Sequence, residues 1–380
     1  MRGPNLTDYV RQLPPHQFGQ RKRVSEWVRV DLLSLFLISL IATYGLIILM
    51  SAVDQNTARV EAQVIRIIVA FSVMIVMAQI PPRLFLRLAP ALYLLGLLLL
   101  FLVLLAGTES KGATRWLRIG PIGFQPSELM KLALPMVLAW YFHDRRLPPR
   151  PRHVGIATLI IAVPVLMIYP QPDLGTSILV AASGLLVLFL AGISWRYIFS
   201  LMGLFLVSAP GLWFVMTDYQ RGRILTLVDP ERDPLGSGWN IIQSMTAIGS
   251  GGLFGKGLFN GTQSQLDFLP ESRTDFIIAV LAEELGLIGV LALLSLYICL
   301  IGRGVVIAVQ AQDTFGRLLA ASITFTFFVY VFVNIGMVSA LLPVVGVPLP
   351  LVSYGGTSML TLCAGFGILM SVHTHRRITL

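Results

Sequence analysis

The most regular feature of the sequence is a succession of long apolar stretches separated by short polar segments. A helix that crosses the hydrocarbon core of a bilayer needs about 20 mostly apolar residues. Ten stretches approach this length, and we predict a membrane-spanning helix in each: Leu32–Ala52, Gln63–Ile80, Leu88–Ala106, Leu129–Phe142, Gly155–Tyr169, Leu174–Leu190, Ile198–Met216, Phe276–Ile301, Leu319–Leu342 and Leu351–Val372. The pattern therefore predicts an all-α, polytopic integral membrane protein with about ten transmembrane helices.

Composition leaves little room for a soluble domain. Of the 380 residues, 56% are hydrophobic and 12% are charged, whereas soluble domains contain about 25% charged residues. We expect a basic N-terminal segment (1–30), a single membrane domain (31–375) and a short tail (376–380). No Gly-x-x-x-x-Gly-Lys-Ser/Thr loop for nucleotides is present, and we expect no nucleic-acid partner.

Basic residues are divided unevenly between the two sets of loops. Ten spans put both chain ends on one side of the membrane, and the loops on that side carry roughly twice as many Lys and Arg residues as the opposite loops. Cytoplasmic loops are the ones that carry such an excess. We therefore expect both ends in the cytoplasm and the two long loops, 107–128 and 217–274, on the periplasmic side of an inner membrane.

The larger of these loops joins the seventh and eighth predicted spans and is rich in glycine. It contains moderately apolar pieces such as Trp239–Ile248, which favour short helices lying on or dipping into the outer leaflet. The glycines suit tight turns and close approach of two backbones.

A carboxylate stands at the outer boundary of the eighth span. Asp275 immediately precedes Phe276, and charged groups at the edge of the membrane are costly enough to require a reason. One reason is helix capping, because a carboxylate near a helix N-terminus accepts backbone N–H groups. The other is a general base that faces the outer leaflet. The sequence leaves both open.

Two further pairs of charged residues lie within spans. Glu128 and Lys131 are three residues apart at the start of the fourth span, close enough to pair on one helix face. In one interpretation the pair neutralises itself and so lets the helix enter the membrane. In the other, Lys131 neutralises a lipid phosphate or holds a carboxylate of a cavity in place. Glu283 and Glu284 are adjacent, so their side chains point about 100° apart. For these two we favour a structural role, with one of them paired to a basic residue from elsewhere.

The outer loops also carry an aromatic and basic set. It consists of Arg115, Trp116, Arg118, Arg221 and Arg223. Arginine matches phosphate oxygens well, and five such groups near one membrane face suit an anionic headgroup. The tryptophan is either an interfacial anchor or a stacking surface for a sugar. Because no nucleotide site is present, a substrate at this face must carry its own energy, for example as a lipid diphosphate.

Several motifs identify a family. The chain resembles the SEDS family (shape, elongation, division and sporulation proteins) in family order over nearly its whole length, in the segments Lys111–Trp116, Phe124–Glu128, Gln171–Ser177, Asp229–Gly236, Gly261–Phe276, Ala282–Gly286 and Pro348–Gly356. The segments Val344–Gly346 and His373–Arg376 are similar to the elongation branch of the family rather than to its division branch.

The resemblance implies a ten-helix fold and a peptidoglycan glycosyltransferase that acts during elongation and rod-shape maintenance. Its substrate would be lipid II, a disaccharide-pentapeptide on undecaprenyl pyrophosphate, which extends a nascent glycan strand at the outer membrane face. It also implies that Asp275 is the catalytic aspartate. An important tryptophan falls on Trp116, and a Glu/Lys pair falls on Glu128 and Lys131.

The chemistry of that reaction agrees with these residues. Attack of a sugar hydroxyl on an anomeric carbon needs a base within about 2.6–3.2 Å, which Asp275 can provide. The diphosphate leaving group needs positive charge, from arginines or from a divalent cation such as Mg²⁺ or Mn²⁺. The metal ligands are unknown from sequence.

Two other functions remain open from the sequence. A lipid II flippase would depend on the intramembrane charges, Arg66 among them, rather than on Asp275. A scaffold without enzymatic activity would only recruit a transpeptidase. The resemblance implies a class B penicillin-binding protein as partner, together with other elongation-complex proteins and membrane lipid.

Overall fold

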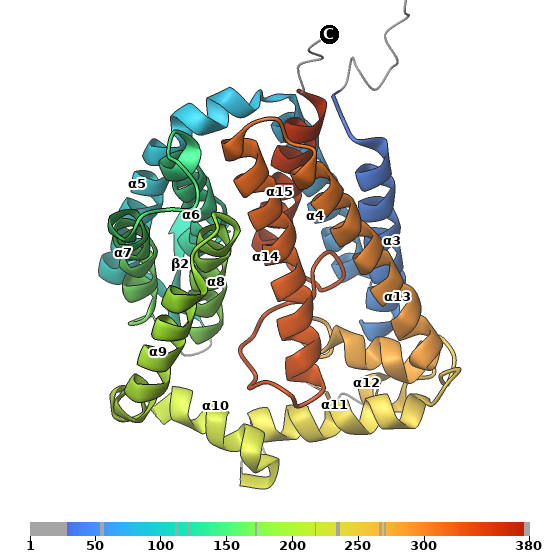
Figure 1. Cartoon of the computed structure of the whole chain (residues 1–380). Coiled ribbons are helices and arrows are strands. Elements are labelled where there is room, and N and C mark those ends of the chain that lie inside the picture. The colour runs from blue at the N-terminus through green and yellow to red at the C-terminus, as the bar shows by residue number, and fades with distance from the viewer. Residues whose placement is uncertain are drawn as a thin grey trace, which may run out of the picture.

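The computed structural model describes residues 29–375 except 54–56, 111–112, 120–121, 172, 217, 233–235, 266–267 and 270. Each predicted span corresponds to a helix (Figure 1): α3 (Leu32–Ala52), α4 (Thr57–Gln79), α5 (Pro82–Ala106), α6 (Pro126–His143), α7 (Pro151–Ile168), α8 (Leu174–Leu190), α9 (Trp195–Val215), α13 (Ile277–Val309), α14 (Thr314–Val338) and α15 (Thr357–Thr374). Within the described ranges, seven of these meet the length and hydropathy of a membrane span. The chain is a helical integral membrane protein, as predicted.

The last two helices begin at residues other than those predicted. The last helix begins at Thr357 instead of Leu351, because the apolar residues before it belong to the loop between α14 and α15 (339–356). The preceding helix begins early, at Thr314, because the side chain of Asp313 accepts a hydrogen bond from Gly316 N and caps it. Hydropathy alone does not distinguish a buried loop from a helix.

The first long outer loop contains a small antiparallel sheet that the sequence analysis did not predict. Its strands are β1 (Thr108–Ser110), β2 (Ala113–Ile119) and β3 (Ile122–Phe124), in the order β1-β2-β3. Trp116 pairs with Thr108, and Leu117 pairs with Phe124. The pairing with β1 and β3 fixes the backbone that carries Arg115 and Trp116.

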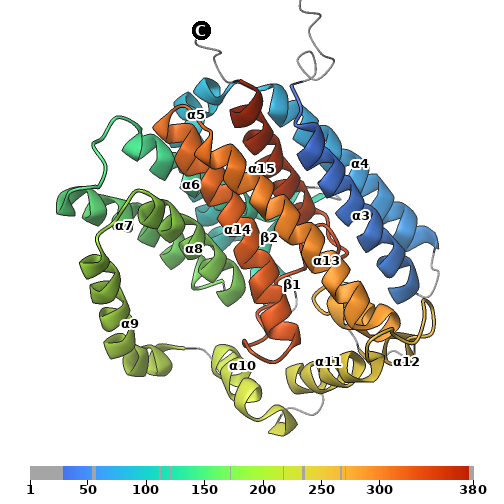
Figure 2. The ribbon, with the colours of Figure 1, turned by 45° about the vertical axis from the view of Figure 1, so that its right-hand side comes forward.

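The second long loop is mostly helical. It contains α10 (Asp218–Val228), a 3₁₀ turn at Pro230–Arg232, α11 (Ser237–Gly251) and α12 (Thr262–Gln265). The short helix predicted at Trp239–Ile248 is part of α11, so this prediction is confirmed. Both α10 and α11 run across one end of the bundle (Figures 1 and 2).

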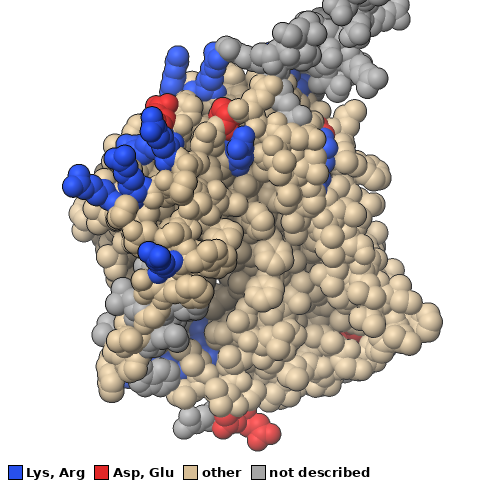
Figure 3. All heavy atoms as spheres, viewed as in Figure 1, with Lys and Arg blue, Asp and Glu red and all other residues tan. Residues whose placement is uncertain are grey.

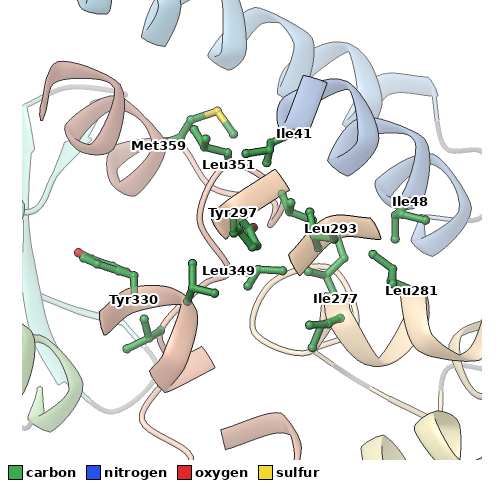
Figure 4. Packing of buried hydrophobic residues seen from close by; sticks show 14 of the residues in the cluster. Ile41, Ile48, Ile277, Leu281, Leu293, Tyr297, Tyr330, Leu349, Leu351 and Met359 are labelled. Atoms are coloured by element: carbon green, nitrogen blue, oxygen red, sulfur yellow. The ribbon is translucent and has the colours of Figure 1, made fainter. Parts of the chain in front are cut away.

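The core consists of two buried clusters that meet at α14 and α15. One joins α3, α4, α13, α14 and α15, and the other joins α5 to α8 with the inner faces of α14 and α15. Figure 4 shows Tyr297 of α13 near Leu349 and Leu351 of the 339–356 loop. Tyr297 Oη donates to Pro350 O at 2.7 Å, so this apolar loop is anchored inside the protein.

Helix α13 is broken near its N-terminal end. Gly286 has φ 65° and ψ −164°, a region that is essentially restricted to glycine. The freed backbone groups pair with the loop after α11: Lys256 N donates to Glu283 O at 3.0 Å, and Leu287 N donates to Gly252 O at 3.0 Å. Broken helices at membrane depth occur where protein covers the exposed backbone, and here the glycine-rich loop provides that cover.

This geometry predicts a stability effect for Gly286→Ala. An added Cβ would lie 2.4 Å from Gly255 N and would occupy a glycine-only conformation, so we expect a loss of about 1–3 kcal/mol or more. Gly302→Ala on the same helix is the control, because nothing lies within 4 Å of its Cβ position. Melting temperatures in detergent compare the two, and equal values would contradict the role given to Gly286.

Both described ends of the chain lie at the opposite end of the bundle from α10 and α11. Arg29 contacts His375 Nε2, and Asp31 accepts two hydrogen bonds from Arg303, at 2.7 and 2.9 Å. Burial opposes ionisation of Asp31, but hydrogen bonds from Arg303 and Ser34 lower its pKa overall. Lys and Arg side chains gather mostly at this end, above a largely uncharged middle (Figure 3). The two described ends of the chain therefore lie at the same end of the helix bundle.

Candidate functional site

An open cavity of about 330 Å³ lies between the sheet, α10 and several helices of the bundle. This volume is at the lower end of the range for ligand pockets. Its wall combines β2, the starts of α6 and α8, α10, α14, the residues just before α13, and the 339–356 loop together with the start of α15. Segments far apart in the sequence thus meet around one space, and most of the predicted site residues line it.

Asp275 lines this cavity and is half-buried. The N-cap of α13 is Phe276, which makes no side-chain cap hydrogen bond, so Asp275 lies one residue before the N-cap position. Gly346, with φ 72°, brings the 339–356 loop close to the carboxylate, and a Cβ at Gly346 would lie 3.5 Å from Asp275 Oδ2. The carboxylate therefore lies at the edge of the space that a ligand would occupy.

The predicted Glu128–Lys131 pair forms a buried wall of the same cavity. Lys131 Nζ lies 2.6 Å from Glu128 Oε1, and each residue is 5% exposed. Lys131 Nζ also lies 5.0 Å from the centroid of the Tyr330 ring. Glu128 Oε2 has no hydrogen-bond partner in the described part of the chain. Lys131 therefore pairs with Oε1 of Glu128, whereas Oε2 of the same carboxylate has no hydrogen-bond partner among the described residues.

Asp173 has a structural role and also faces the cavity. Its Oδ1 accepts from Thr176 N at 3.1 Å and caps α8. Its Oδ2 lies 3.2 Å from Gln125 Nε2 and 3.5 Å from Arg115 Nε. The carboxylate thus fixes α8, α6 and β2 relative to one another at the cavity wall.

Strand β2 presents Arg115 and Trp116 to the cavity. The Trp116 ring packs against β3, where a Cβ on Gly123 would lie 3.3 Å from Trp116 Cε3. Arg118, on the same strand, is exposed and does not line the cavity. The sheet therefore selects two members of the predicted aromatic and basic set and excludes a third.

The two arginines of α10 are separated by the helix. Residues two apart on a helix point about 200° apart. Arg223 lines the cavity and donates to Val344 O at 2.6 Å. Arg221 does not line it and donates to Phe214 O at 2.9 Å. The structure thus brings Arg223 to the cavity but not Arg221, and a ligand contact of Arg221 stays a prediction.

Glu283 and Glu284 lie outside the cavity and are fully buried. Glu283 pairs with Lys256 at 2.7 Å and accepts from Thr262 N at 2.8 Å, at the start of α12. Glu284 accepts from Ser51 Oγ of α3. These partners lie in different elements, and the contacts agree with the structural role favoured from the sequence.

Several wall residues were not assigned from the sequence. Gln125, Gly346 and Tyr354 belong to motifs that resemble the family but suggested no individual role. Tyr330 lies within an apolar span and gave no signal at all. Arg66 of α4 stacks on the ring of Tyr354, with its Cζ 4.3 Å from the ring centroid. Arg66 thus holds a side chain that lines the cavity.

The charged side chains of the wall are balanced in sign. Arg115, Lys131 and Arg223 face the same space as three carboxylates, those of Glu128, Asp173 and Asp275. No group of three or more His, Cys, Asp or Glu residues suited to a metal ion occurs in the part of the chain that the structure describes. The arrangement suits a ligand that brings anionic oxygens together with a hydroxyl group that is to lose its proton.

Comparison with known proteins identifies related chains. The family model FTSW_RODA_SPOVE, described as a cell cycle protein, matches residues 29–378. The chain is 53% identical over 359 residues to the peptidoglycan glycosyltransferase MrdB of Escherichia coli (strain K12), covering 94% of this chain and 97% of that protein. It is 37% identical over 370 residues to a probable peptidoglycan glycosyltransferase FtsW of Geobacter metallireducens, with coverage of 94% and 98%.

Solved structures of related proteins are also similar to this chain. One chain, from work on the structural coordination of polymerization and crosslinking by a peptidoglycan synthase complex, is 31% identical with a TM-score of 0.81, covering 92% of this chain and 99% of that one. The rod shape determining protein RodA of Thermus thermophilus is 30% identical with a TM-score of 0.70, covering 91% and 97%.

Proposed function

Because the chain belongs to the family of FtsW, RodA and SpoVE, we propose that it is a peptidoglycan glycosyltransferase of the elongation branch, which polymerises glycan strands from lipid II. The observation that carries this proposal is the position of Asp275, whose carboxylate lines a cavity together with Arg115, Lys131 and Arg223. The cavity thus combines a base with cationic groups, which are the two elements that the transfer of a sugar from a diphosphate requires.

Asp275 acts as the general base in this proposal. The 4-hydroxyl of the acceptor lipid II sugar attacks the anomeric carbon at the end of the growing chain, and its proton passes to the Asp275 carboxylate. The new C–O bond forms as the bond from the anomeric carbon to the diphosphate breaks, which releases the polyprenyl diphosphate. A single displacement of this kind inverts the configuration at the anomeric carbon.

The cationic side chains stabilise the leaving group. A diphosphate is already acidic, so no second carboxylic acid is needed, in contrast to the carboxyl pair of glycosidases. The guanidinium groups of Arg115 and Arg223 and the buried ammonium of Lys131 lie in the same wall. Charges that are fixed in advance stabilise developing negative charge without reorganisation during the reaction.

We propose that a divalent cation, Mg²⁺ or Mn²⁺, accompanies the diphosphate. Magnesium is commonly held by one or two carboxylates plus substrate phosphates, so a protein cluster of three ligands is not required. Glu128 Oε2 is buried and has no hydrogen-bond partner among the described residues, and it is the oxygen that fits such an ion. When bound, the cation would offset charge on the leaving diphosphate.

The orientation in the membrane follows from the charge distribution. The positive-inside rule puts both chain ends in the cytoplasm, and the cavity wall includes Arg223 of α10, a helix at the other end of the bundle (Figure 1). The active site then faces the periplasm, where the polyprenyl tails of both substrates lie in the outer leaflet. We propose a class B penicillin-binding protein as partner, which is supported by the similarity to a peptidoglycan synthase complex.

The two arginines of α10 provide a matched test of the cavity. Arg223→Gln removes a cation from the wall, and we expect the KM for lipid II to rise about tenfold or more, because a hydrogen bond to a charged group contributes about 1.5–3 kcal/mol. Arg221→Gln removes the same charge two residues away, outside the cavity, and should leave KM unchanged. Initial polymerisation rates at varied lipid II concentration measure both, and a larger effect of Arg221→Gln would contradict the assignment.

Purified protein incubated with labelled lipid II tests the function itself. We expect glycan strands longer than the disaccharide, resolved on a gel, and their loss when a chelator removes divalent cations, with recovery on addition of Mg²⁺ or Mn²⁺. Activity that is insensitive to chelator would overturn only the cation proposal. If lipid II crosses a vesicle membrane but is never elongated, even with the partner protein present, the result would instead indicate a flippase.

A further inference from the structure

The backbone that carries Asp275 is held by hydrogen bonds from one side. The carbonyl oxygens of residues 273–275 all accept a hydrogen bond, in chain order from Tyr354 N at 2.9 Å, Ser353 Oγ and Asn334 Nδ2 at 2.9 Å. The three donors come from the 339–356 loop and from α14. Three consecutive carbonyl groups are thus fixed immediately before α13 begins.

Asn334 connects this backbone to the cavity wall. Its side chain is fully buried, and Nδ2 also donates to Val347 O at 2.7 Å. Val347 and Asp275 both line the cavity, whereas Asn334 does not. Asn334 follows Tyr330 by one helical turn, so the two side chains share a face of α14. One amide therefore sets the distance between the segment with the catalytic carboxylate and the opposite loop.

Ser353 holds the carbonyl of Thr274, the residue before Asp275, in a similar way. Its hydroxyl donates to Thr274 O and accepts from Leu349 N at 2.8 Å, and its own carbonyl accepts from Gln63 Nε2 of α4 at 3.3 Å. Ser353 is 5% exposed. The loop is thus tied both to the segment before α13 and to a neighbouring helix.

We propose that Asn334 and Ser353 are positioning residues of the polymerase, which hold the Asp275 carboxylate at the correct distance from the acceptor hydroxyl. This inference rests on the proposed function. Catalytic groups must be held within about 0.5 Å of their productive position, and a shift of about 1 Å can reduce the rate about a hundredfold. An apolar side chain of equal size at position 334 cannot supply these donors, and the carbonyl oxygens of Asp275 and Val347 would lose their partner.

The variant Asn334→Leu tests the proposal. It keeps nearly the same volume but removes both hydrogen bonds, so we expect kcat to fall about tenfold to a hundredfold, with the KM for lipid II within about twofold of wild type. Asn334→Gln keeps the amide and should recover part of kcat. Rates are measured well below the melting temperature of every variant, with lipid II and the full-length protein.

The control is Ser322→Ala on the same helix. Ser322 is also fully buried and donates one hydrogen bond to a backbone carbonyl, Ser183 O at 3.1 Å, but it does not contact the Asp275 segment. We expect it to lower the melting temperature and to leave kcat unchanged. An equal loss of kcat in Ser322→Ala and Asn334→Leu would show a general loss of structure and overturn the proposal.

The kcat values of further variants distinguish a failure of this inference from a failure of the proposed function. An Asn334→Leu protein with wild-type kcat, beside an inactive Asp275→Asn, would overturn the positioning role and leave the function intact. An active Asp275→Asn would overturn the proposed mechanism instead. If Asn334→Leu does not fold, Ser353→Ala decides: a kcat reduced at least about tenfold with unchanged KM supports the proposal, and a wild-type kcat overturns it.

Discussion

The Asp275→Asn protein is expected to bind lipid II normally and to polymerise it about 10²–10⁴-fold more slowly than wild type, because this is the usual contribution of a general base. The exchange keeps the shape of the side chain, and the N-cap of α13 is Phe276 rather than Asp275, so the melting temperature should change little. Single-turnover rates and a binding isotherm for lipid II separate the loss of chemistry from a loss of affinity.

Asp313→Asn is the matched control for this change. Asp313 is exposed and caps α14 at the other end of the bundle, and asparagine is an equally good N-cap. We therefore expect wild-type rates and stability. Full activity in Asp275→Asn, measured beside this control, would contradict the role of Asp275 as base.

Removal of Lys131 is expected to have the largest effect on stability. Lys131→Met leaves the Glu128 carboxylate buried without its cation, and breaking a buried ion pair in this way costs about 3–5 kcal/mol. The double variant Glu128→Gln/Lys131→Met removes both charges and should restore most of the melting temperature. Thermal unfolding in detergent measures the single and the double variants.

Activity of the double variant decides what the pair is for. Lys131 lines the cavity, so we expect the folded double variant to lose about tenfold or more in rate, from the absence of a charged partner for the diphosphate. Wild-type activity would instead show that the pair only neutralises itself. The Asp31–Arg303 pair is the control, because it lies at the opposite end and its neutral double exchange should not change the rate.

The helices were predictable because a bilayer demands long apolar stretches, and each of the ten predicted spans is a helix. The sheet was not predicted, because its strands are short and depend on pairing between segments rather than on local pattern. The break of α13 at Gly286 was also missed. A glycine in an apolar run does not show that a distant loop will supply its backbone partners.

The cavity was predictable only where charge marked it. Asp275, Lys131 and Arg115 stood out because charged groups near the membrane need a reason, and all three line the cavity. Asn334 and Tyr330 are neutral side chains inside an apolar span and gave no signal. Arg221 was grouped with Arg223 because the helical phase of α10 was not predicted, and only Arg223 lines the cavity.

The most direct test of the account is a structure of the Asp275→Asn protein with lipid II bound, since this variant should hold the substrate without converting it. We predict that the 4-hydroxyl oxygen of the acceptor sugar lies about 2.6–3.2 Å from the side chain of residue 275, with the diphosphate beside Arg115, Lys131 and Arg223. Lipid II bound with both sugars outside this cavity would contradict the account.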